Sequence, residues 1–384
     1  MRVALFGPYM FELAVGLREN PANDVRLFLD QETLPRSLRS ETMLDDPDFV
    51  EIGPWVSGRS ILRPSVSAIT SRMADYDLAL VTELGPVFAR HSGIPYVFIP
   101  TGWDLTCGPF PLRSRSSRRR GIGDLSAMVV AVRMRGGIRA AAGLWGAPFA
   151  PFATAADRLG RPLTHNLPQP VDTDLFSPQR LCHESEASDR IVIFHPSRMM
   201  MSENRFLVET GQCKRNQVLF EGMADAVAAG ADVRLRLLRR ASSPDEDEAV
   251  RRLEALGLTE RVEWLDAGRP EGFTWAELAD LYRSADLVAD EFGGWFGLVA
   301  IEGAACGRPV LNHVEPDTME AMYPDGHPFL QASSAAEVAE AIRMVGDVDH
   351  RRRLGVASRQ WVLRHHDRSV VARWAEVTLS EMGL

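Results

Sequence analysis

Cysteine is scarce in this sequence, and the cysteines that are present show no pairing pattern. The chain of 384 residues has four, at the scattered positions Cys107, Cys182, Cys213 and Cys306. A disulfide framework or a structural zinc site needs cysteines, or cysteines and histidines, at short repeated spacings. The sequence therefore excludes both as the basis of the fold and favours a reducing compartment.

Long apolar segments are also lacking. No apolar run reaches the ~18 residues that a membrane-spanning helix needs. The first residues, Met1 to Gly7, pass directly into a strand pattern without the regions typical of a signal peptide. We therefore expect a cytoplasmic protein.

Basic residues are outnumbered by acidic ones. There are 43 Lys and Arg against 52 Asp and Glu, which gives a formal net charge of −9. Such a chain has no global positive field to attract nucleic acid, and no nucleic-acid-binding motif accompanies its arginines. The apolar fraction of 45% is ordinary for a globular protein, and the length favours two domains over one.

Predicted strands and helices alternate along both halves of the chain. In the first half, strands are predicted at 2–7, 24–30, 77–82 and 95–100, with a helix at 11–19. In the second half, strands are predicted at 191–195, 233–238, 262–265, 287–291, 310–313 and 329–332, and helices at 215–229, 245–256, 275–284, 298–306, 316–322, 335–345, 350–365 and 369–382. This alternation indicates βαβ units and a mostly parallel sheet in each half, with ligands at the carboxyl ends of the strands.

A segment with the composition of a linker separates the two halves. Residues 163–178 contain Pro168, Pro170 and Pro178 and lead into a polar run. Asp172 and Asp174 lie within it, but two acids in a turn do not indicate a metal site. We therefore expect a domain boundary here and no metal.

The stretch that carries the most chemistry is residues 290–310. A predicted strand ends in Asp290 and Glu291, a glycine-rich loop follows, and a predicted helix begins near Gly297 and stops at Gly307. Free backbone N–H groups and the helix dipole favour an anion at such a helix N-terminus. Glu302 lies about one turn inside the helix, where a carboxylate can accept two hydrogen bonds from a sugar diol. The stretch predicts a clamp for a sugar phosphate or a nucleotide.

The run from Trp295 to Val310, with Glu302 inside it, resembles the donor-site signature of retaining, nucleotide-sugar-dependent glycosyltransferases of family 4. The resemblance implies the GT-B architecture, an α/β fold with two Rossmann-like doubly wound domains facing a central cleft. It implies an acceptor-binding domain at 1–168, a donor-binding domain at 169–368, and a last helix at 369–384 that packs back on the first domain through Trp374 and Leu379.

One position departs from the family signature. Relatives usually carry two glutamates separated by seven residues, but here Gly294 stands eight positions before Glu302. Glu291 or Asp290, which lie just before Gly294, are the candidates to supply the missing carboxylate. The alternatives are that both only order the loop, or that the chain is catalytically impaired; we favour an active enzyme.

The resemblance also implies two cations that hold the donor diphosphate. Arg198 follows the predicted strand 191–195, and Lys214 lies further along the same long loop, with Arg215 as the alternative to Lys214. Fixed cations stabilise the negative charge that develops on a diphosphate leaving group. The further donor-binding residues that the resemblance implies are Ser197, Asp290, Gly293, Gly294, Phe296, Gly297, Leu298 and Val299.

Two turns in the first half are candidates for the acceptor side. One contains Gly7 and Tyr9, after the first predicted strand; Gly7 lacks the further glycines of a dinucleotide fingerprint, so an NAD site is not expected. The other, Thr101-Gly102-Trp103-Asp104, resembles the acceptor-side loop of the same family, with Asp104 as a catalytic candidate. The alternative is a strand-ending turn in which Asp104 caps the next segment.

Residues 111–140 are unusually basic. They contain one acid, Asp124, and apolar residues interleave with the arginines Arg113, Arg115, Arg118, Arg119, Arg120, Arg133, Arg135 and Arg139. A basic amphipathic stretch can lie on anionic lipid, so peripheral contact with the inner face of a membrane is one interpretation. A solvated basic helix with a loop, or a cationic lining for a phosphate-rich cleft, are the others.

Together these features predict a metal-independent, cofactor-free glycosyltransferase with retention of configuration. Its donor would be a UDP- or GDP-linked sugar, and its acceptor a small molecule or a lipid-linked molecule of cell-envelope glycan or secondary-metabolite biosynthesis. A nucleotide-sugar 2-epimerase on the same architecture and a non-catalytic nucleotide-sugar-binding module are the alternatives. Residues 31–75 and 111–145, which should shape the acceptor pocket, match no pattern that identifies the acceptor.

Overall fold

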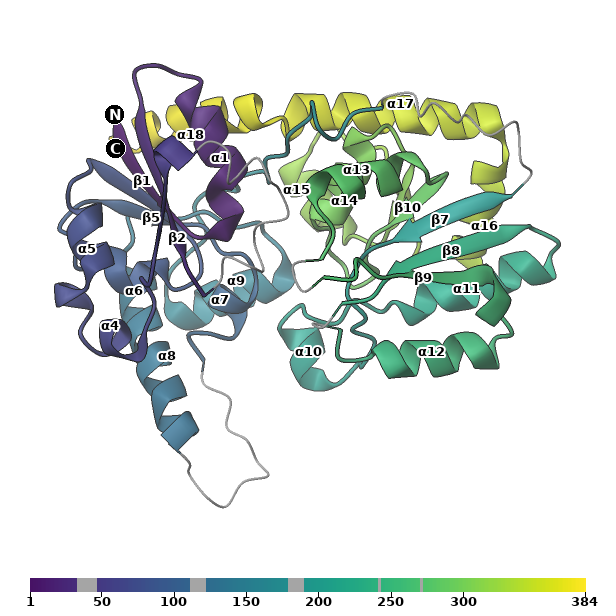
Figure 1. The fold of residues 1–384 in the computed structure, drawn as a ribbon, viewed down its shortest axis with the longest axis horizontal. Coiled ribbons are helices and arrows are strands. Elements are labelled where there is room, and N and C mark those ends of the chain that lie inside the picture. Colours follow the sequence, from purple (N-terminus) through teal and green to yellow (C-terminus); the bar gives the residue numbers. More distant parts are fainter. Residues whose placement is uncertain (33–46, 111–121, 179–189, 241–242, 270–271) are drawn as a thin grey trace. The chain divides into compact units, whose positions relative to one another are not determined.

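The chain folds into two compact units, described here separately. The structure is a computed structural model that describes residues 1–32, 47–110, 122–178, 190–240, 243–269 and 272–384 (Figure 1). Unit 1 comprises Met1–Pro170 and Arg368–Leu384, and unit 2 comprises Val171–Asp367. Cys182 and the arginines at 113–120 lie outside the described residues.

Unit 1 is built on a parallel sheet with helices packed against it. Its described residues form six strands in the order β3-β2-β1-β4-β5-β6. The strands are β1 (Arg2–Phe6), β2 (Asp24–Asp30), β3 (Val50–Gly53), β4 (Leu78–Val81), β5 (Tyr96–Phe98) and β6 (Gly143–Leu144). The α-helices are α1 (Phe11–Arg18), α4 (Gly58–Leu62), α5 (Ala68–Met73), α6 (Gly85–Ala89), α7 (Trp103–Thr106), α8 (Ile122–Ala140), α9 (Ala150–Leu159) and α18 (Arg368–Glu381), with short 3₁₀ turns at η1 (Pro8–Met10), η2 (Pro47–Phe49) and η3 (Pro64–Val66).

The helix α18 brings the end of the chain onto unit 1 by packing against α1. A Cβ atom at Gly16 would lie 2.4 Å from the Arg368 carbonyl oxygen, so only a glycine allows this approach. Trp374 on α18 meets Trp145 edge-on with ring centroids 5.3 Å apart, and Leu379 is buried. The close contact between α1 and α18 therefore depends on the small size of Gly16, and Trp374 and Leu379 pack α18 against the rest of unit 1.

Unit 2 repeats the same plan. Its described residues form six parallel strands in the order β12-β11-β10-β7-β8-β9. The strands are β7 (Ile191–His195), β8 (Val233–Leu238), β9 (Val262–Leu265), β10 (Leu287–Ala289), β11 (Val310–Asn312) and β12 (Leu330–Gln331). The helices are α10 (Arg205–Glu209), α11 (Gln217–Ala228), α12 (Glu246–Ala255), α13 (Trp275–Arg283), α14 (Leu298–Ala305), α15 (Pro316–Met322), α16 (Ala335–Gly346) and α17 (Val348–His365), with a 3₁₀ turn at η4 (Thr259–Arg261).

Each face of the unit 2 sheet has its own core, as the alternation of side chains along a strand requires. Ile191 and Ile193 of β7 pack with α11 and α16 on one face, whereas Phe194 packs with α13 and α14 on the other. Helices therefore cover both faces of the sheet (Figure 1). The prediction of an α/β chain with doubly wound sheets is confirmed.

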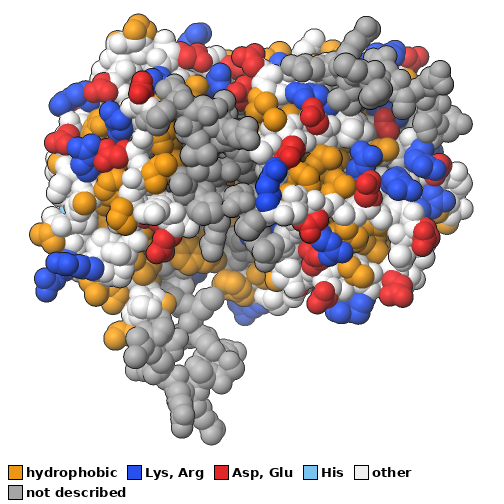
Figure 2. All heavy atoms as spheres, in the orientation of Figure 1, with side chains coloured by type: hydrophobic (Ala, Val, Ile, Leu, Met, Phe, Trp, Pro, Cys, Tyr) orange, Lys and Arg blue, Asp and Glu red, His pale blue; other side chains and the backbone are white. Residues whose placement is uncertain are grey.

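The surface carries charges of both signs. Figure 2 shows acidic and basic side chains interspersed with apolar ones over the described part of the visible face. This distribution agrees with the absence of a global positive field that the net charge of −9 indicates.

The segments that the sequence patterns missed lie at the edges of the first sheet and between its strands. β3 pairs only with β2 among the described strands, and β6 only with β5. Both are short, and α4 and α5 fall in the polar stretch 31–75 for which we predicted no elements. The predicted strand 329–332 is shorter in the structure, at Leu330–Gln331.

Candidate functional site

The site predicted from the 290–310 stretch lies where the strand order of unit 2 reverses direction. β10 and β7 are parallel neighbours at this point, and the chain leaves them toward opposite faces of the sheet. In open α/β sheets, the crevice outside the carboxyl ends of two such strands is where ligands bind. Pro196–Arg198 follow β7 and Asp290–Gly294 follow β10, so the fold brings these two segments together.

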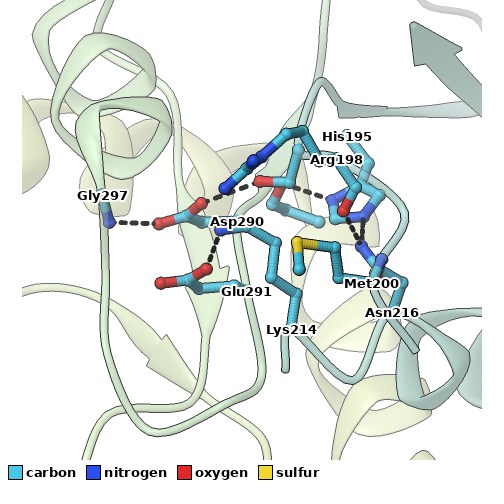
Figure 3. A network of polar contacts seen from close by, with 10 residues as sticks. His195, Arg198, Met200, Lys214, Asn216, Asp290, Glu291 and Gly297 are labelled. Atoms are coloured by element: carbon cyan, nitrogen blue, oxygen red, sulfur yellow. Dashed lines mark hydrogen bonds and ion pairs between the residues drawn. The ribbon is translucent and has the colours of Figure 1, made fainter. Parts of the chain in front are cut away.

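Asp290 ties the end of β10 to both neighbouring segments. Its Oδ1 accepts a 3.0 Å hydrogen bond from the Ser197 hydroxyl, and its Oδ2 accepts a 2.7 Å hydrogen bond from the Gly297 backbone N–H (Figure 3). The side chain is 1% exposed, and burial together with the charge of Glu291 raises the pKa of Asp290. Both oxygens are therefore engaged in holding the loop that precedes α14.

A buried histidine and asparagine shape the loop that carries Arg198. His195 Nδ1 lies 2.9 Å from the Ala289 carbonyl oxygen and Nε2 lies 2.8 Å from Asn216 Nδ2, so Nδ1 carries the proton and Nε2 accepts. Asn216 also donates to the Arg198 carbonyl oxygen and accepts from the Met200 N–H, at 3.1 and 2.9 Å. Burial lowers the pKa of His195 to about 4, so the ring is neutral.

Lys214 is the single lysine of the chain. Its ammonium group donates to Glu291 Oε2, and the two side chains are 18% and 9% exposed (Figure 3). Arg215, the alternative, pairs instead with Glu203, 3.2 Å away, in an exposed position. Arg215 has a φ of +51°, a left-handed conformation that turns the chain into α11 just after Lys214. The geometry favours Lys214 as the cation of this site.

Arg198 completes the polar surface of the site. Its side chain extends from the loop after β7 toward Asp290 (Figure 3). Among the described residues, no acidic side chain forms an ion pair with its guanidinium group. The first N–H groups of α14, on Leu298 and Val299, have no acceptor within the helix. The site therefore offers a forked cation, an ammonium group and a helix N-terminus to an anion.

Gly293 and Gly294 of this loop each have a different structural role. A Cβ atom at Gly293 would lie 2.1 Å from the Cys213 carbonyl oxygen, so the loop after β10 can pass the Lys214 segment only with glycine. Gly294 has a φ of +96° and forms a β-bridge with Val314. Phe296, predicted to contact the donor, is 2% exposed and packs in the core against Phe329 and Trp361, so its side chain belongs to the core.

Glu302 is buried on α14 and has an aromatic partner. The Tyr282 hydroxyl on α13 donates a 2.7 Å hydrogen bond to Glu302 Oε2. Glu302 is 5% exposed, and burial together with its charge raises the pKa of Tyr282, so the tyrosine stays a donor. That Glu302 binds a sugar diol stays a prediction.

The predicted acceptor-side residues lie in unit 1, at the carboxyl ends of β1 and β5. Asp104 is 1% exposed and accepts backbone hydrogen bonds from Thr101, Gly102 and Glu83, each at 2.9 Å. Burial raises the pKa of Asp104 to about 6, although these donors oppose the shift. The carboxylate organises the turn from within α7, whose N-cap is Gly102 and has no side-chain cap, so Asp104 does not cap the next segment as the second interpretation expected. A catalytic role of Asp104 stays a prediction.

The aromatic side chains of these turns are exposed. Tyr9 and Trp103 are 54% and 55% exposed. Gly7, with a φ of +112°, lies so close to Thr82 that an added Cβ would meet the Thr82 hydroxyl at 1.9 Å. Contact of Gly7, Tyr9, Thr101, Gly102 and Trp103 with an acceptor stays a prediction.

Four contributors to the site escaped the sequence analysis. They are His195, Asn216, Tyr282 and Glu315, the last of which lies beside Gly294. His195 and Asn216 adjoin predicted residues in the sequence, which is a usable signal. Tyr282 and Glu315 come from other elements, and nothing in their local sequence connects them with the loop.

These features define the class of protein by fold. Solved structures of three proteins match nearly the whole chain at low identity: Anabaena HepE in complex with UDP-glucose (18% identity, TM-score 0.64, 99% of this chain and 100% of that chain), sucrose-phosphate synthase from Thermosynechococcus elongatus (16%, 0.65, 100% and 99%) and a glycosyltransferase from Rickettsia africae (12%, 0.65, 99% and 98%). The chain has the GT-B fold, as predicted.

One part of the sequence matches a protein family. Residues 234–376 match the glycosyl transferase-like family model, so this part of the chain is a glycosyl transferase-like domain, and the predicted resemblance is confirmed. D-inositol 3-phosphate glycosyltransferases from Segniliparus rotundus (33% identical over 38% of this chain and 30% of that protein) and Salinispora tropica (43% over 19% and 16%) are similar. The matches span about a third or less of these relatives.

Proposed function

We propose that the chain is a glycosyltransferase that moves a sugar from a UDP- or GDP-linked donor to an acceptor hydroxyl, with retention of configuration. The observation that carries the proposal is the arrangement at the carboxyl ends of β7 and β10. Arg198, Lys214 and the N-terminus of α14 converge there, and Glu302 lies in the same helix. The similarity of residues 234–376 to glycosyltransferases supports it.

The reaction asks these residues mainly for charge stabilisation. The bond between the anomeric carbon and the donor phosphate oxygen breaks while the bond to the acceptor oxygen forms, and the acceptor proton passes to a phosphate oxygen. Negative charge develops on the diphosphate, where Arg198, Lys214 and the α14 amides stabilise it. Asp290, His195 and Asn216 touch no substrate in this scheme; they hold the two loops that present the cations.

Calorimetric titration with UDP, UDP-glucose, GDP and GDP-mannose tests donor binding directly. Arg198→Ala is expected to lower the affinity for the donor by roughly tenfold or more, since the substitution removes a charge-assisted contact. Arg343→Ala, which removes an exposed arginine from α16, is the matched control and should bind as the wild type. Unchanged donor affinity in the Arg198 variant would contradict the assignment of the diphosphate site.

Lys214 offers a second readout because no other lysine is present. Reductive ¹³C-methylation labels this side chain and the N-terminal amine, and the two signals are distinguishable by NMR. A donor diphosphate at Lys214 should shift the lysine signal and slow its labelling. A binding donor that leaves both unchanged would place the diphosphate elsewhere.

Two other functions are outcomes of the same experiments. A UDP-GlcNAc 2-epimerase from Methanocaldococcus jannaschii has a similar fold, with a TM-score of 0.52 at 11% identity. Isomerisation of the donor sugar without an acceptor would indicate an epimerase. Donor binding with neither hydrolysis, isomerisation nor transfer would indicate a non-catalytic binding module.

We also propose that the acceptor is presented at an anionic lipid surface. On α8, Leu125, Met128 and Val132 are 65%, 54% and 56% exposed, at the helical spacing that places them in one stripe. No helix in the described part of the chain is long and apolar enough to cross a bilayer. The exposed apolar stripe of α8 fits a peripheral contact, since apolar side chains of a surface helix can enter the interface, and the eight arginines among residues 111–140 supply positive charge that anionic headgroups attract.

Co-sedimentation with vesicles tests this surface. Binding to vesicles that contain phosphatidylglycerol, and weaker binding to pure phosphatidylcholine, is the expected result. Changing Leu125, Met128 and Val132 to serine should abolish it, whereas Val348→Ser with Val356→Ser, which changes exposed valines of α17, should not. Equal binding by both variants would leave α8 without this role.

A further inference from the structure

The carboxylates of the loop after β10 are already engaged. Asp290 binds Ser197 and Gly297, and Glu291 binds Lys214. Both residues are more than nine-tenths buried, with 1% of Asp290 and 7% of Glu291 exposed. Neither therefore presents a free oxygen pair to the hydroxyl groups of a bound sugar without first giving up a contact that holds the loop.

A different carboxylate lies beside the position where the loop has no side chain. Glu315 follows β11, the strand next to β10, and its backbone N–H donates a 3.2 Å hydrogen bond to the Gly294 carbonyl oxygen. A Cβ atom built on Gly294 would lie 3.4 Å from both Cγ and Oε1 of Glu315. The Glu315 side chain thus occupies the space next to Gly294 that a side chain of the loop would otherwise fill.

The Glu315 carboxylate is available to a ligand. Its side chain is 58% exposed, in contrast to the buried acids at 290, 291 and 302. His313 Nε2 lies 3.6 Å from Oε1 and is the closest charged or titratable neighbour of this carboxylate in the described ion pairs. Glu315 precedes α15 without a side-chain hydrogen bond to that helix, so its carboxylate is not consumed in capping.

Backbone contacts fix this carboxylate relative to the proposed diphosphate site. The His313 N–H donates to the Glu291 carbonyl oxygen at 3.0 Å, and Gly294 bridges to Val314. The segment 313–315 is thereby attached to the same loop that contacts Lys214 through Glu291. A sugar attached to a diphosphate at Lys214 would extend from that loop, and its hydroxyl groups need acceptors of this kind.

We propose that Glu315, held beside Gly294 and His313, is the carboxylate that binds hydroxyl groups of the donor sugar. This assignment rests on the proposed function, since it requires a nucleotide sugar at this site. It makes Glu315 a sugar-binding residue and His313 a positioning residue for it. Asp290 and Glu291, which the sequence offered for this task, then keep their contacts within the loop.

Paired titrations separate the sugar from the rest of the donor. The experiment compares four proteins: the wild type, Glu315→Gln, Glu315→Ala and the control Glu320→Gln, which removes an exposed acid beyond Glu315, from helix α15. Each protein is titrated with a nucleoside diphosphate and with its hexose conjugate, either UDP and UDP-glucose or GDP and GDP-mannose. Both Glu315 variants should bind the conjugate about tenfold more weakly. They should bind the diphosphate alone, and the control should bind both probes, as the wild type does.

Three results would overturn the assignment. Conjugate affinity that is unchanged in Glu315→Ala removes Glu315 from the sugar site. An equal loss for diphosphate and conjugate indicates an effect on the fold of the loop instead of a contact with the sugar. Wild-type protein that binds no nucleotide sugar overturns the proposed function itself, and this assignment with it, so the two failures are distinguishable.

The role of His313 has its own readout. His313→Gln should reduce the ratio of conjugate to diphosphate affinity by a smaller factor than Glu315→Ala, because the carboxylate remains but is less well held. In the double variant with Glu315→Ala, the His313 change should add nothing further to that ratio. An additive effect would mean that His313 acts independently of Glu315.

Discussion

The Tyr282 hydroxyl donates a 2.7 Å hydrogen bond to Glu302, and both side chains are buried between α13 and α14. The bond fixes one oxygen of the carboxylate on which the donor site was predicted. It also gives a way to separate what Glu302 does for stability from what it does for binding.

Tyr282→Phe should lower the free energy of unfolding by about 1–3 kcal/mol, because it leaves a buried carboxylate oxygen without its donor. Glu302→Gln keeps an acceptor for Tyr282 and should stay closer to wild type in stability while it weakens donor binding. Urea unfolding and donor titration of both variants check this split. If Glu302→Gln binds donor as tightly as wild type, the carboxylate has only a structural role.

Lys214 and Glu291 should be strongly coupled. Lys214→Ala leaves Glu291 largely buried without its cation, and we expect a loss of roughly 3 kcal/mol in unfolding free energy. Adding Glu291→Gln to that variant should recover about 1–3 kcal/mol of the loss. A double-mutant cycle measured by urea unfolding gives the coupling, and additive effects would argue against this ion pair.

The His195–Asn216 contact predicts a specific pH dependence. Because burial lowers the pKa of His195 to about 4 from its ordinary value of 6.5, the unfolded chain binds more protons in this interval. This group therefore makes the protein less stable as the pH falls from about 6.5 to about 4, by on the order of 3 kcal/mol.

Asn216→Asp should reduce or reverse that loss, since a carboxylate facing Nε2 favours the imidazolium ion. Unfolding free energies of wild type and variant between pH 4.5 and 7.5 measure the difference, in which contributions common to both proteins cancel. Asn204→Asp is the control, because the Asn204 side chain accepts a hydrogen bond from the Leu207 N–H as an aspartate also can. Parallel pH profiles for wild type and Asn216→Asp would refute the assigned contact.

Two glycines of one loop should respond differently to alanine. Gly293→Ala forces a Cβ atom into the Cys213 carbonyl oxygen, so the two segments must separate, at a cost of about 1–3 kcal/mol. A Cβ atom at Gly297 meets nothing within 4 Å, and Gly297→Ala should leave the unfolding free energy near that of wild type. Thermal unfolding of both variants measures the difference in stability. Equal losses of stability would contradict the close approach of Gly293 to the Cys213 carbonyl oxygen.

Much of the fold could be predicted from local patterns. The central strands β1, β7 and β10 are buried on both faces, so each is a continuous apolar run that the sequence displays. The edge strands β3 and β6 have a partner on one side only and are short, so their sequences carry little pattern. The boundaries of α14 and α15 followed from glycine and proline at their ends.

The site was harder to predict because its contacts join distant segments. The sequence predicted Asp290 and Glu291 near a ligand. Nothing in the local sequence indicates that the Gly297 N–H bonds to Asp290 or that the Lys214 ammonium group bonds to Glu291. Phe296 is adjacent to the loop in sequence and yet faces the core. Glu315 lies far along the chain from Gly294 and reaches it only because β10 and β11 are neighbours.

The two sheets have the same strand order, so the residues at the same position of each sheet can be compared. In each sheet the strand order reverses once, between β1 and β4 in one unit and between β7 and β10 in the other. At the first reversal the chain places Gly7, Thr82 and the acidic Glu83; at the second it places Arg198 and Lys214 together with several acids. The same strand order thus occurs twice, but the second reversal carries an arginine and a lysine, which gives an anion an electrostatic reason to bind there.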